Sequence, residues 1–475
     1  MDRRDFLAVV AGTLPAWSAL AAAQDERQWR AGVATVDITP APGLWMAGFA
    51  ARTEAARGTA MPLFAKALAL EDARGRRAVL VTLDLLGVTG GMAATIAAEA
   101  NRRYQLPRAS LMLNASHTHC GPVVDEMLSV AYDLTQPQRD AIAAYTRDLE
   151  SRVVRVIGDA LAVLAPARLR FGQGGCSFAA NRRVQFTPDG PVDHTVPVLH
   201  VERQVQTAAN PANTPTLAIV FGYACHNTTL QATFTQFHGD YAGVAQAALQ
   251  QRHPGVTAMF VSGCGADANP KPRGTIELVE QHGKALADAV DNALPVVTAQ
   301  WPLFATLETA FDTVDLPFAP VPDRDGWTER LKNDDVYVRR HARLMLDTIE
   351  RDKRLPAAQT DPIQVWALGQ EHAQGLTLVA LGGEVVVDYA KRLKAESSNG
   401  ERTWIASYSN DVFGYVPSQR VLKEGGYEGG GAMIYYGRPG AFTPDVEPLI
   451  VDTVHRLVRT AAPAAPMRTP SSSPR

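Results

Sequence analysis

The sequence predicts an α/β fold in which mixed β-sheets are flanked by helices within one large domain. Short apolar, strand-like runs alternate with helical runs along the chain, an order that is typical of layered α/β proteins. Polar side chains with metal-binding or catalytic chemistry follow several of these apolar runs, where sites form in open α/β sheets. No linker or internal repeat divides residues 24–461, so we expect a single domain over that range.

The first half of the expected domain contains strands that are separated by turns or helices. Pro40 ends the first strand, and a turn at residues 72–76 joins the two strands of a hairpin. The expected strands are 33–40, 67–71, 78–85, 110–113, 167–171, 196–201, 216–223 and 257–262. The expected helices are 90–104, 136–164, one opening at 239 and running to about 252, and 276–293.

The second half repeats this alternation with fewer elements. Residues 303–314 are strand-like, and residues 325–352 have the spacing of one charged amphipathic helix. The remaining expected elements are strands 362–368, 376–381 and 404–408, a helix ending near 396, and a last helix at 445–461.

The overall composition excludes some classes of function. The 475 residues carry a net charge of −3, with 46% hydrophobic and 20% charged residues, as in ordinary globular proteins. The chain has no basic run, so we expect no nucleic-acid partner. The four cysteines are too few for a disulfide framework; most are expected to be small buried side chains, with one disulfide left open: Cys120, Cys176, Cys225 and Cys264.

The two ends of the chain have compositions that differ from the domain. Residues 1–23 begin with Arg3-Arg4, continue with a short apolar run and end in three alanines, which is typical of a cleaved secretory signal of the twin-arginine type. The apolar run is short for a membrane span, so we expect none in the mature chain, the alternative being an uncleaved anchor. We expect a periplasmic or secreted protein with a disordered tail at residues 462–475, rich in Pro, Ser and Ala.

Two histidines follow the apolar run that ends at Leu113. If the strand continues, His117 and His119 lie two residues apart on one face and point the same way. A His-x-His pair on a strand is a common way to offer nitrogens to a divalent metal. The alternative is that both are surface histidines near a turn. A His-x-His pair taken without its context indicates this alternative more often than a metal site.

Other potential ligands follow later strands and favour the metal site. His226 follows the strand at 216–223, Glu384 follows the strand at 376–381, and Tyr415 lies in a loop after the strand at 404–408. Two imidazoles and a carboxylate are a typical catalytic zinc set, which leaves a position open for water or substrate. The alternatives are a buried, hydrogen-bonded histidine, a turn carboxylate and a core tyrosine. We interpret the set as the site of a metal hydrolase.

A series of short motifs, in this order and spacing, gives the chain a family resemblance. They are Asp37-Ile38-Thr39-Pro40, Gly48-Phe49, His117-Thr118-His119-Cys120-Gly121-Pro122, Asn181-Arg182, Cys225-His226-Asn227-Thr228, Gly239-Asp240, Gly383-Glu384, Gly414-Tyr415-Val416 and Tyr427-Glu428-Gly429. The chain resembles the neutral (alkaline, non-lysosomal) ceramidases over most of residues 24–461.

The resemblance implies an α/β domain of mixed sheets that hydrolyses the amide of an N-acylsphingosine. It also implies one zinc ion per chain, held by His117, His226, Glu384 and Tyr415. We expect His119 to bind the carbonyl oxygen or to move a proton, and Arg182 to bind a polar part of the substrate. Their alternatives are a second metal or a supporting contact for His119, and a structural ion pair for Arg182. Zinc suits the mixed nitrogen and oxygen set, although iron or manganese can occupy similar sites.

The sequence departs from the family at the active-site serine, which lies in a Gly-Asp-x-Ser-Pro pattern. The matching residues here are Ala266 to Pro270, and Asn269 stands at the serine position. An amide can hydrogen-bond but is not a good nucleophile, so we expect Asn269 to orient water or substrate, with Asp267 facing the same pocket. The chain also ends soon after its last helix, so we expect the C-terminal β-sandwich of the full ceramidases to be absent.

These observations predict an exported, zinc-dependent hydrolase. The enzyme would cleave an amide or ester bond of a small or lipid-like N-acyl substrate with metal-activated water, since zinc lowers the pKa of bound water to about 7. The alternatives are a true ceramidase and a non-catalytic, ligand-binding descendant of the fold. The oligomeric state does not follow from the sequence.

Overall fold

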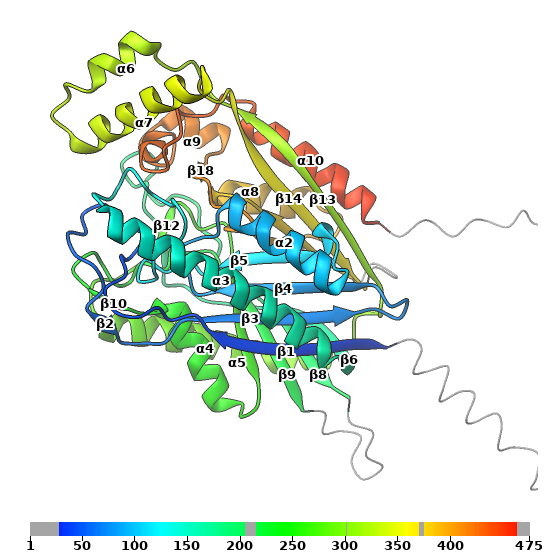
Figure 1. The fold of residues 1–475 in the computed structure, drawn as a ribbon. Coiled ribbons are helices and arrows are strands. Elements are labelled where there is room, and N and C mark those ends of the chain that lie inside the picture. Colours follow the sequence, from blue (N-terminus) through cyan, green and yellow to red (C-terminus); the bar gives the residue numbers. More distant parts are fainter. Residues whose placement is uncertain (1–27, 205–214, 301, 370–374, 463–475) are drawn as a thin grey trace, which may run out of the picture.

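Two β-sheets pack face to face, and helices cover both outer sides (Figure 1). The computed structural model describes residues 28–204, 215–300, 302–369 and 375–462; the expected signal segment 1–23 and all but the first residue of the expected tail lie outside them. The larger sheet has the strand order β11-β9-β8-β6-β1-β3-β4-β5, and the smaller has the order β13-β14-β15-β17. The predicted α/β fold of mixed sheets flanked by helices is confirmed.

The larger sheet mixes antiparallel and parallel neighbours. β1 pairs antiparallel with β3, whereas β4 pairs parallel with β5, and β9 pairs parallel with β11. Its strands are β1 (Trp29–Asp37), β3 (Phe64–Glu71), β4 (Arg77–Leu83), β5 (Leu111–Ala115), β6 (Ala165–Gly175), β8 (Thr195–Arg203), β9 (Thr216–Tyr223) and β11 (Thr257–Ser262).

The smaller sheet and three short ladders complete the strands. The smaller sheet contains β13 (Leu307–Pro317), β14 (Ala358–Leu368), β15 (Leu376–Leu381) and β17 (Thr403–Ala406). The ladders pair β2 (Gly58–Thr59) with β10 (Gln236–Phe237), β7 (Ala179–Asn181) with β12 (Ala268–Pro270), and β16 (Glu384–Val385) with β18 (Tyr415–Val416).

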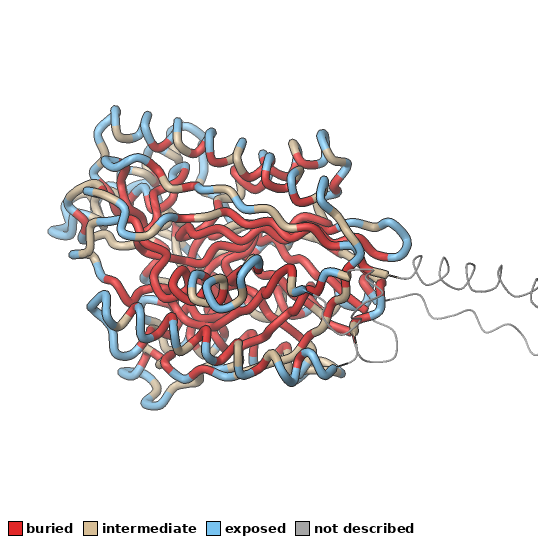
Figure 2. The backbone as a smooth tube through the Cα atoms, turned by 90° about the horizontal axis from the view of Figure 1, so that it is seen from below, coloured by how far each residue is buried: buried red, intermediate tan, exposed pale blue. Residues whose placement is uncertain are grey.

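The layers follow from the alternation of side chains along each strand. In β3, Leu68 and Leu70 face the smaller sheet and share a core with Trp366 and Trp404. The intervening alanines face the outer helices, because successive strand residues point to opposite faces. The buried strands therefore run through the interior, whereas the helices expose one side (Figure 2).

Three pairs of helices cover the outer faces. One part of the larger sheet is covered by α2 (Gly90–Tyr104) and α3 (Gln136–Ala162), and the rest by α4 (Asp240–Arg252) and α5 (Ile276–Ala299). The smaller sheet is covered by α8 (Val387–Glu396) and α10 (Val446–Thr460). Short helix α9 (Gln419–Glu424) lies in the glycine-rich region before α10.

The two terminal strands of the larger sheet meet at their carboxyl ends. Ser262, at the end of β11, donates from its backbone N–H to Asn114 Oδ1 (2.9 Å) and from its hydroxyl to Ala115 O (2.8 Å) in β5. Asn114 Nδ2 donates in turn to Ser407 O (2.7 Å), just after β17. These hydrogen bonds among Asn114, Ser262 and Ser407 form a buried node that brings together the ends of three strands from both sheets. The loops that follow these strands build the candidate site.

One predicted helix is wrong. The expected continuous helix at 325–352 is two helices, α6 (Arg324–Arg330) and α7 (Val336–Asp352). The side chain of Asp335 accepts a hydrogen bond from Tyr337 N and caps α7, and Asn333 Oδ1 accepts from Asp335 N (2.9 Å). Asn and Asp side chains compete with helical backbone bonding, which ends α6 and restarts the helix.

The described residues include all four cysteines and every helix that could be tested as a membrane span. All four cysteines are buried and free. Among the described residues, no helix combines the length and the apolar character that crossing a bilayer requires.

A buried lysine lies between the larger sheet and α4. Lys66 Nζ donates to Gln246 Oε1 (2.9 Å), Gln250 Oε1 (3.0 Å) and Ala258 O (2.7 Å). Burial lowers the pKa of Lys66 from 10.5 to about 8, and the nearby Asp84 opposes this shift only in part. The folded chain therefore loses this proton at a lower pH than the unfolded chain does.

The free energy of unfolding is expected to rise between pH 8 and pH 10.5, because in this window only the unfolded chain still binds the Lys66 proton. The shift corresponds to about 3 kcal/mol over the whole window. Urea unfolding at several pH values should show this rise in the wild type and in the exposed-site control Lys332→Met. Lys66→Met should lack it, and an unchanged pH dependence in Lys66→Met would exclude Lys66 as its source.

Candidate metal centre

The His-x-His pair lies in a turn rather than on a strand, which corrects the structural argument made from the sequence. β5 ends at Ala115, and His117 has a left-handed backbone conformation (φ 61°), so strand alternation does not orient the two rings. The hydroxyl of Thr118 donates to His238 O (2.7 Å), and Thr118 also forms a parallel bridge with Asn227. The turn is thereby fixed to the segment that carries His226.

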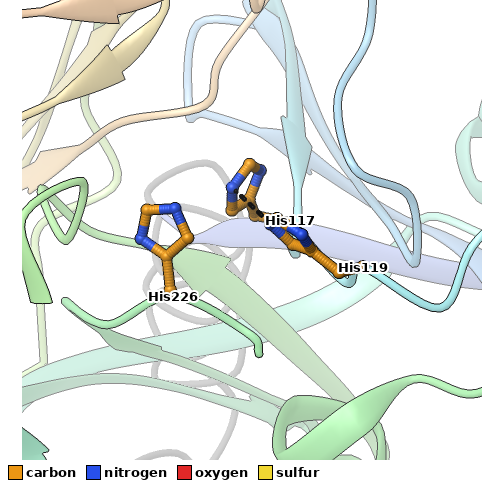
Figure 3. A group of neighbouring side chains, drawn as sticks. All are labelled: His117, His119 and His226. Atoms are coloured by element: carbon orange, nitrogen blue, oxygen red, sulfur yellow. Dashed lines mark hydrogen bonds between the residues drawn. The ribbon is translucent and has the colours of Figure 1, made fainter. Parts of the chain in front are cut away.

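Three imidazoles converge on one point in the interior (Figure 3). One nitrogen from each of His117, His119 and His226 lies within 4.8 Å of the others, and all three side chains are buried. His117 Nδ1 bonds Leu86 O (2.7 Å), and His226 Nδ1 bonds Gly265 O (2.9 Å). A carbonyl only accepts, so each Nδ1 carries a proton and each Nε2 is left to face the shared point.

Strand pairing brings the two oxygen ligands to the same point. β16 and β18 pair in parallel with Glu384 opposite Tyr415. Glu384 Oε2 lies 3.1 Å from both His117 Nε2 and His226 Nε2, and the Tyr415 hydroxyl lies 3.1 Å from His226 Nε2. The structure therefore brings together all four residues that the sequence predicts as metal ligands.

The electrostatics of this group fit a bound cation. Burial lowers the pKa of His226 to about 4, so its ring is neutral at pH 7. Glu384 Oε2 is buried and has no hydrogen-bond donor among the described residues, although two imidazole nitrogens lie beside it. A cation at this point would satisfy the oxygen and both nitrogens. Nitrogen and oxygen donors of this kind suit zinc and also other first-row metals.

His119 differs from the other two histidines in its hydrogen bonding. Its Nε2 lies 3.1 Å from His117 Nε2, and its buried Nδ1 has no partner among the described residues. Burial, followed by the neighbouring imidazoles, holds the pKa of His119 well below its usual value. Its ring packs against Phe49 (4.7 Å between centroids) and lies directly against Gly48. No carbonyl of a described residue bonds either ring nitrogen, so either nitrogen can carry the proton.

Arg182 lies next to the phenol of Tyr415. Its guanidinium donates to the Tyr415 hydroxyl (2.9 Å), to Glu428 Oε1 (2.6 Å) and, more distantly, to Asn269 Oδ1 (3.4 Å). Asn269 Oδ1 also lies 3.4 Å from the Thr228 hydroxyl. Arg182 is thus ion-paired, as in the structural alternative, and it lies beside the metal group, while its predicted contact with substrate stays a prediction.

Asp267 lies close in sequence to Asn269 but has a different environment. One carboxylate oxygen accepts from Val387 N (3.0 Å) at the start of α8, and the other accepts from Asn181 Nδ2 (3.1 Å). Burial raises the pKa of Asp267 to about 6. Both oxygens are engaged with structural groups, so the carboxylate holds α8 and the Asn181 loop in place, and Arg182 N also bonds its carbonyl oxygen (2.8 Å).

Three further residues at the centre were not identified from the sequence. The Tyr436 hydroxyl donates to Glu384 Oε1, the ring of Tyr408 packs against His117 (4.3 Å between centroids), and Arg52 Nη2 donates to His119 O (2.9 Å). Only Arg52 lies near a quoted motif, a few residues after Phe49. Isolated tyrosines give no periodic or spacing signal, so the sequence does not distinguish these from core aromatics.

Replacing Tyr436 by phenylalanine is expected to weaken metal binding about 10- to 100-fold, because it removes the hydroxyl that holds Glu384 Oε1. Metal affinity can be measured by competition with a chelating dye. Tyr435→Phe is the matched control, since the Tyr435 ring packs against Tyr337 instead (5.3 Å between centroids). Equal affinities in the two variants would exclude this supporting role.

Comparisons with known proteins agree with the fold and the site. Residues 29–274 match the family described as neutral/alkaline non-lysosomal ceramidase, N-terminal. The structure is similar to a crystal structure of neutral ceramidase from Pseudomonas aeruginosa, with a TM-score of 0.69, 19% identity, and coverage of 92% of this chain and 76% of that chain. A structure described as ceramidase complexed with C2 gives a TM-score of 0.69, 18% identity, and coverage of 91% and 76%. No curated protein sequence matches.

The fold and the site define an α/β protein with a buried imidazole group that could hold a metal ion. The chain belongs to the neutral/alkaline non-lysosomal ceramidase family, since the match covers more than half of its length. This membership supports a ceramidase-like hydrolase, and it confirms the family resemblance that the sequence motifs indicated.

Proposed function

We propose that this protein is an exported, zinc-dependent hydrolase that cleaves the amide or ester bond of a lipid-like N-acyl substrate with water as the nucleophile. The convergence of His117 Nε2, His226 Nε2 and Glu384 Oε2 carries the proposal. His117, His226, Glu384 and Tyr415 would hold the ion. When bound, zinc supplies Lewis acidity that polarises an acyl carbonyl and makes water acidic enough to react near neutral pH.

The protein's own groups provide proton transfer and orientation. His119 has one nitrogen at the centre and an unpartnered second nitrogen, so its ring can accept a proton from the attacking water and return it to the leaving nitrogen or oxygen. Arg182 holds the Tyr415 hydroxyl at the edge of the metal group. As the alternative to holding the ion, that hydroxyl can stabilise negative charge on the substrate oxygen.

Asn269 supports water rather than a side chain as the nucleophile. Its Oδ1 faces Arg182 and Thr228, whereas its Nδ2 has no hydrogen bond to a described residue and can donate to the substrate. An amide side chain is not a nucleophile, so Asn269 cannot take over the role of a hydroxyl at this position. Asn269 therefore orients the acyl group while the attack comes from water.

The proposal predicts about one zinc per chain and release of a carboxylic acid from at least one member of a panel of N-acyl amides and esters, ceramide included. Zinc content can be measured by mass spectrometry on protein that has not been exposed to chelators. Turnover of shorter amides but not of ceramide would identify the substrate range, and turnover of ceramide would make the protein a true ceramidase. Bound zinc without turnover of any substrate would favour the ligand-binding descendant.

Export is supported by the twin arginine and the apolar run within residues 1–23. Cell fractionation with an antibody against the chain tests it. The mature protein is expected outside the cytoplasm and shortened by about 23 residues, and replacing Arg3 and Arg4 by lysine should retain it in the cytoplasm. Equal amounts outside the cytoplasm with and without the arginines would contradict the twin-arginine route.

A further inference from the structure

Tyr408 lies against the metal centre in a state that is unfavourable in two respects. Its backbone is left-handed (φ 53°), a conformation that bulky residues rarely adopt. Its hydroxyl is buried and forms no hydrogen bond with a described residue, which costs free energy. Strained residues of this kind persist only where the surrounding structure holds them, and they cluster at functional sites. The position of Tyr408 therefore needs an explanation beyond the filling of the core.

The backbone of Tyr408 is fixed between two segments that carry metal ligands. Its N–H donates to Gly383 O (3.0 Å), next to Glu384. Its carbonyl oxygen accepts from Ala115 N (3.1 Å), two residues before His117. These two hydrogen bonds hold the strained residue in place, and its side chain is buried between the same two segments.

The ring of Tyr408 lies across the imidazole of His117. The ring centroids are 4.3 Å apart and the ring planes differ by 32°. The rings of His119 and His226 are nearly perpendicular to that of His117 instead (87° and 82°). The bond from His117 Nδ1 to Leu86 O fixes one end of the imidazole, but a single hydrogen bond leaves the ring free to tilt. The contact with Tyr408 limits this tilt, so Nε2 stays directed at the point that the three imidazoles share.

We propose that Tyr408 is a positioning residue of the metal centre. Its ring holds the plane of the His117 imidazole and stabilises the positive charge that this imidazole shares when a cation is bound. The face of a tyrosine ring attracts a cation, and the attraction is stronger in a desolvated site. The ring has this role and the hydroxyl does not, since the hydroxyl has no partner among the described residues. The inference rests on the metal site of the proposed function, but not on hydrolysis.

The test is titration of the full chain with cobalt(II) after its own metal has been removed, because the visible absorption of bound cobalt reports the geometry of its ligands. Tyr408→Leu should bind cobalt at least about tenfold more weakly than the wild type and should shift the absorption bands, since the ring that orients His117 is lost. Tyr408→Phe keeps the ring and should match the wild type in affinity and spectrum. Both substitutions meet the same left-handed backbone, so strain does not distinguish them.

Phe260→Leu separates the contact with His117 from general core packing. Phe260 is as buried as Tyr408, but its ring packs against Phe221 (5.7 Å between centroids) in the larger sheet. This control should lose stability and keep the cobalt affinity and spectrum of the wild type. If Tyr408→Leu does not fold, Tyr408→Met, which fills the space with a longer side chain, takes its place.

Three results would overturn the inference. The first is wild-type affinity and spectrum in Tyr408→Leu or its methionine substitute. The second is a Tyr408→Phe variant that binds as weakly as Tyr408→Leu, which would assign the role to the hydroxyl. The third is a folded wild type that binds no cobalt, which would overturn the metal site as well. Cobalt binding with the expected differences, but without turnover of any substrate, would support the inference and count against the proposed hydrolase alone.

Discussion

Replacing Glu384 by glutamine is expected to remove bound metal and hydrolysis together while the fold remains intact. Glutamine keeps the shape of the side chain but removes the charge that lies 3.1 Å from two imidazole nitrogens. Loss of a residue that only supports a ligand already costs about 10- to 100-fold, so loss of the carboxylate itself should reduce turnover at least about 100-fold. Metal content per chain should fall in parallel.

The metal-free variant is expected to stay folded. Glutamine keeps an oxygen that can accept from the Tyr436 hydroxyl, so the substitution removes the charge and leaves that hydrogen bond in place. Glu329→Gln, the same exchange at a residue whose side chain is 71% exposed, is the control. Full metal content in Glu384→Gln would show that the three imidazoles hold the ion alone. Full activity without metal would refute metal-dependent hydrolysis.

Replacing Gly48 by alanine is expected to reduce turnover by about 100-fold without removing the metal. Gly48 has φ 99°, and a Cβ atom there would lie 2.4 Å from His119 Nδ1. The methyl group and the imidazole cannot occupy these positions together, so His119 must move. A displacement of about 1 Å in a group that transfers a proton can cost about 100-fold in rate.

Gly43→Ala separates this steric effect from backbone strain. Gly43 has nearly the same backbone angle (φ 98°), but a Cβ atom there would meet nothing within 4 Å. Both substitutions should cost about 1–3 kcal/mol in the free energy of unfolding, because a side chain rarely adopts this conformation. Only Gly48→Ala should lose activity. If the two variants lose equal activity, strain in the loop rather than the position of His119 sets the rate.

The sequence predicted that His226 and Glu384 come together because each follows an apolar strand. His226 and Glu384 follow β9 and β15, both strands lie in parallel pairs, and the carboxyl ends of such strands meet at one edge. The local signals were therefore sufficient to predict that these side chains come together. The alternation of apolar runs likewise predicted the mixed α/β fold.

Features that depend on tertiary contacts could not be predicted in the same way. The orientation of His117 depends on a left-handed backbone angle, and its turn is fixed by residues more than a hundred positions away. Tyr436 is recognisable only once Glu384 lies beside it. The break between α6 and α7 depends on whether Asp335 caps a new helix or faces solvent within a longer one, and the charge pattern is compatible with both.

The node formed by Asn114, Ser262 and Ser407 has a consequence for the energetics of folding. It places the imidazoles of the region matched to the family beside oxygen ligands from the later part of the chain. A metal ion held there would act as a cross-link between two distant lengths of chain. At a free concentration about a thousandfold above its dissociation constant, the ion would add about 4 kcal/mol to the free energy of unfolding. Cofactor supply would then control how long the folded protein persists as well as how fast it works.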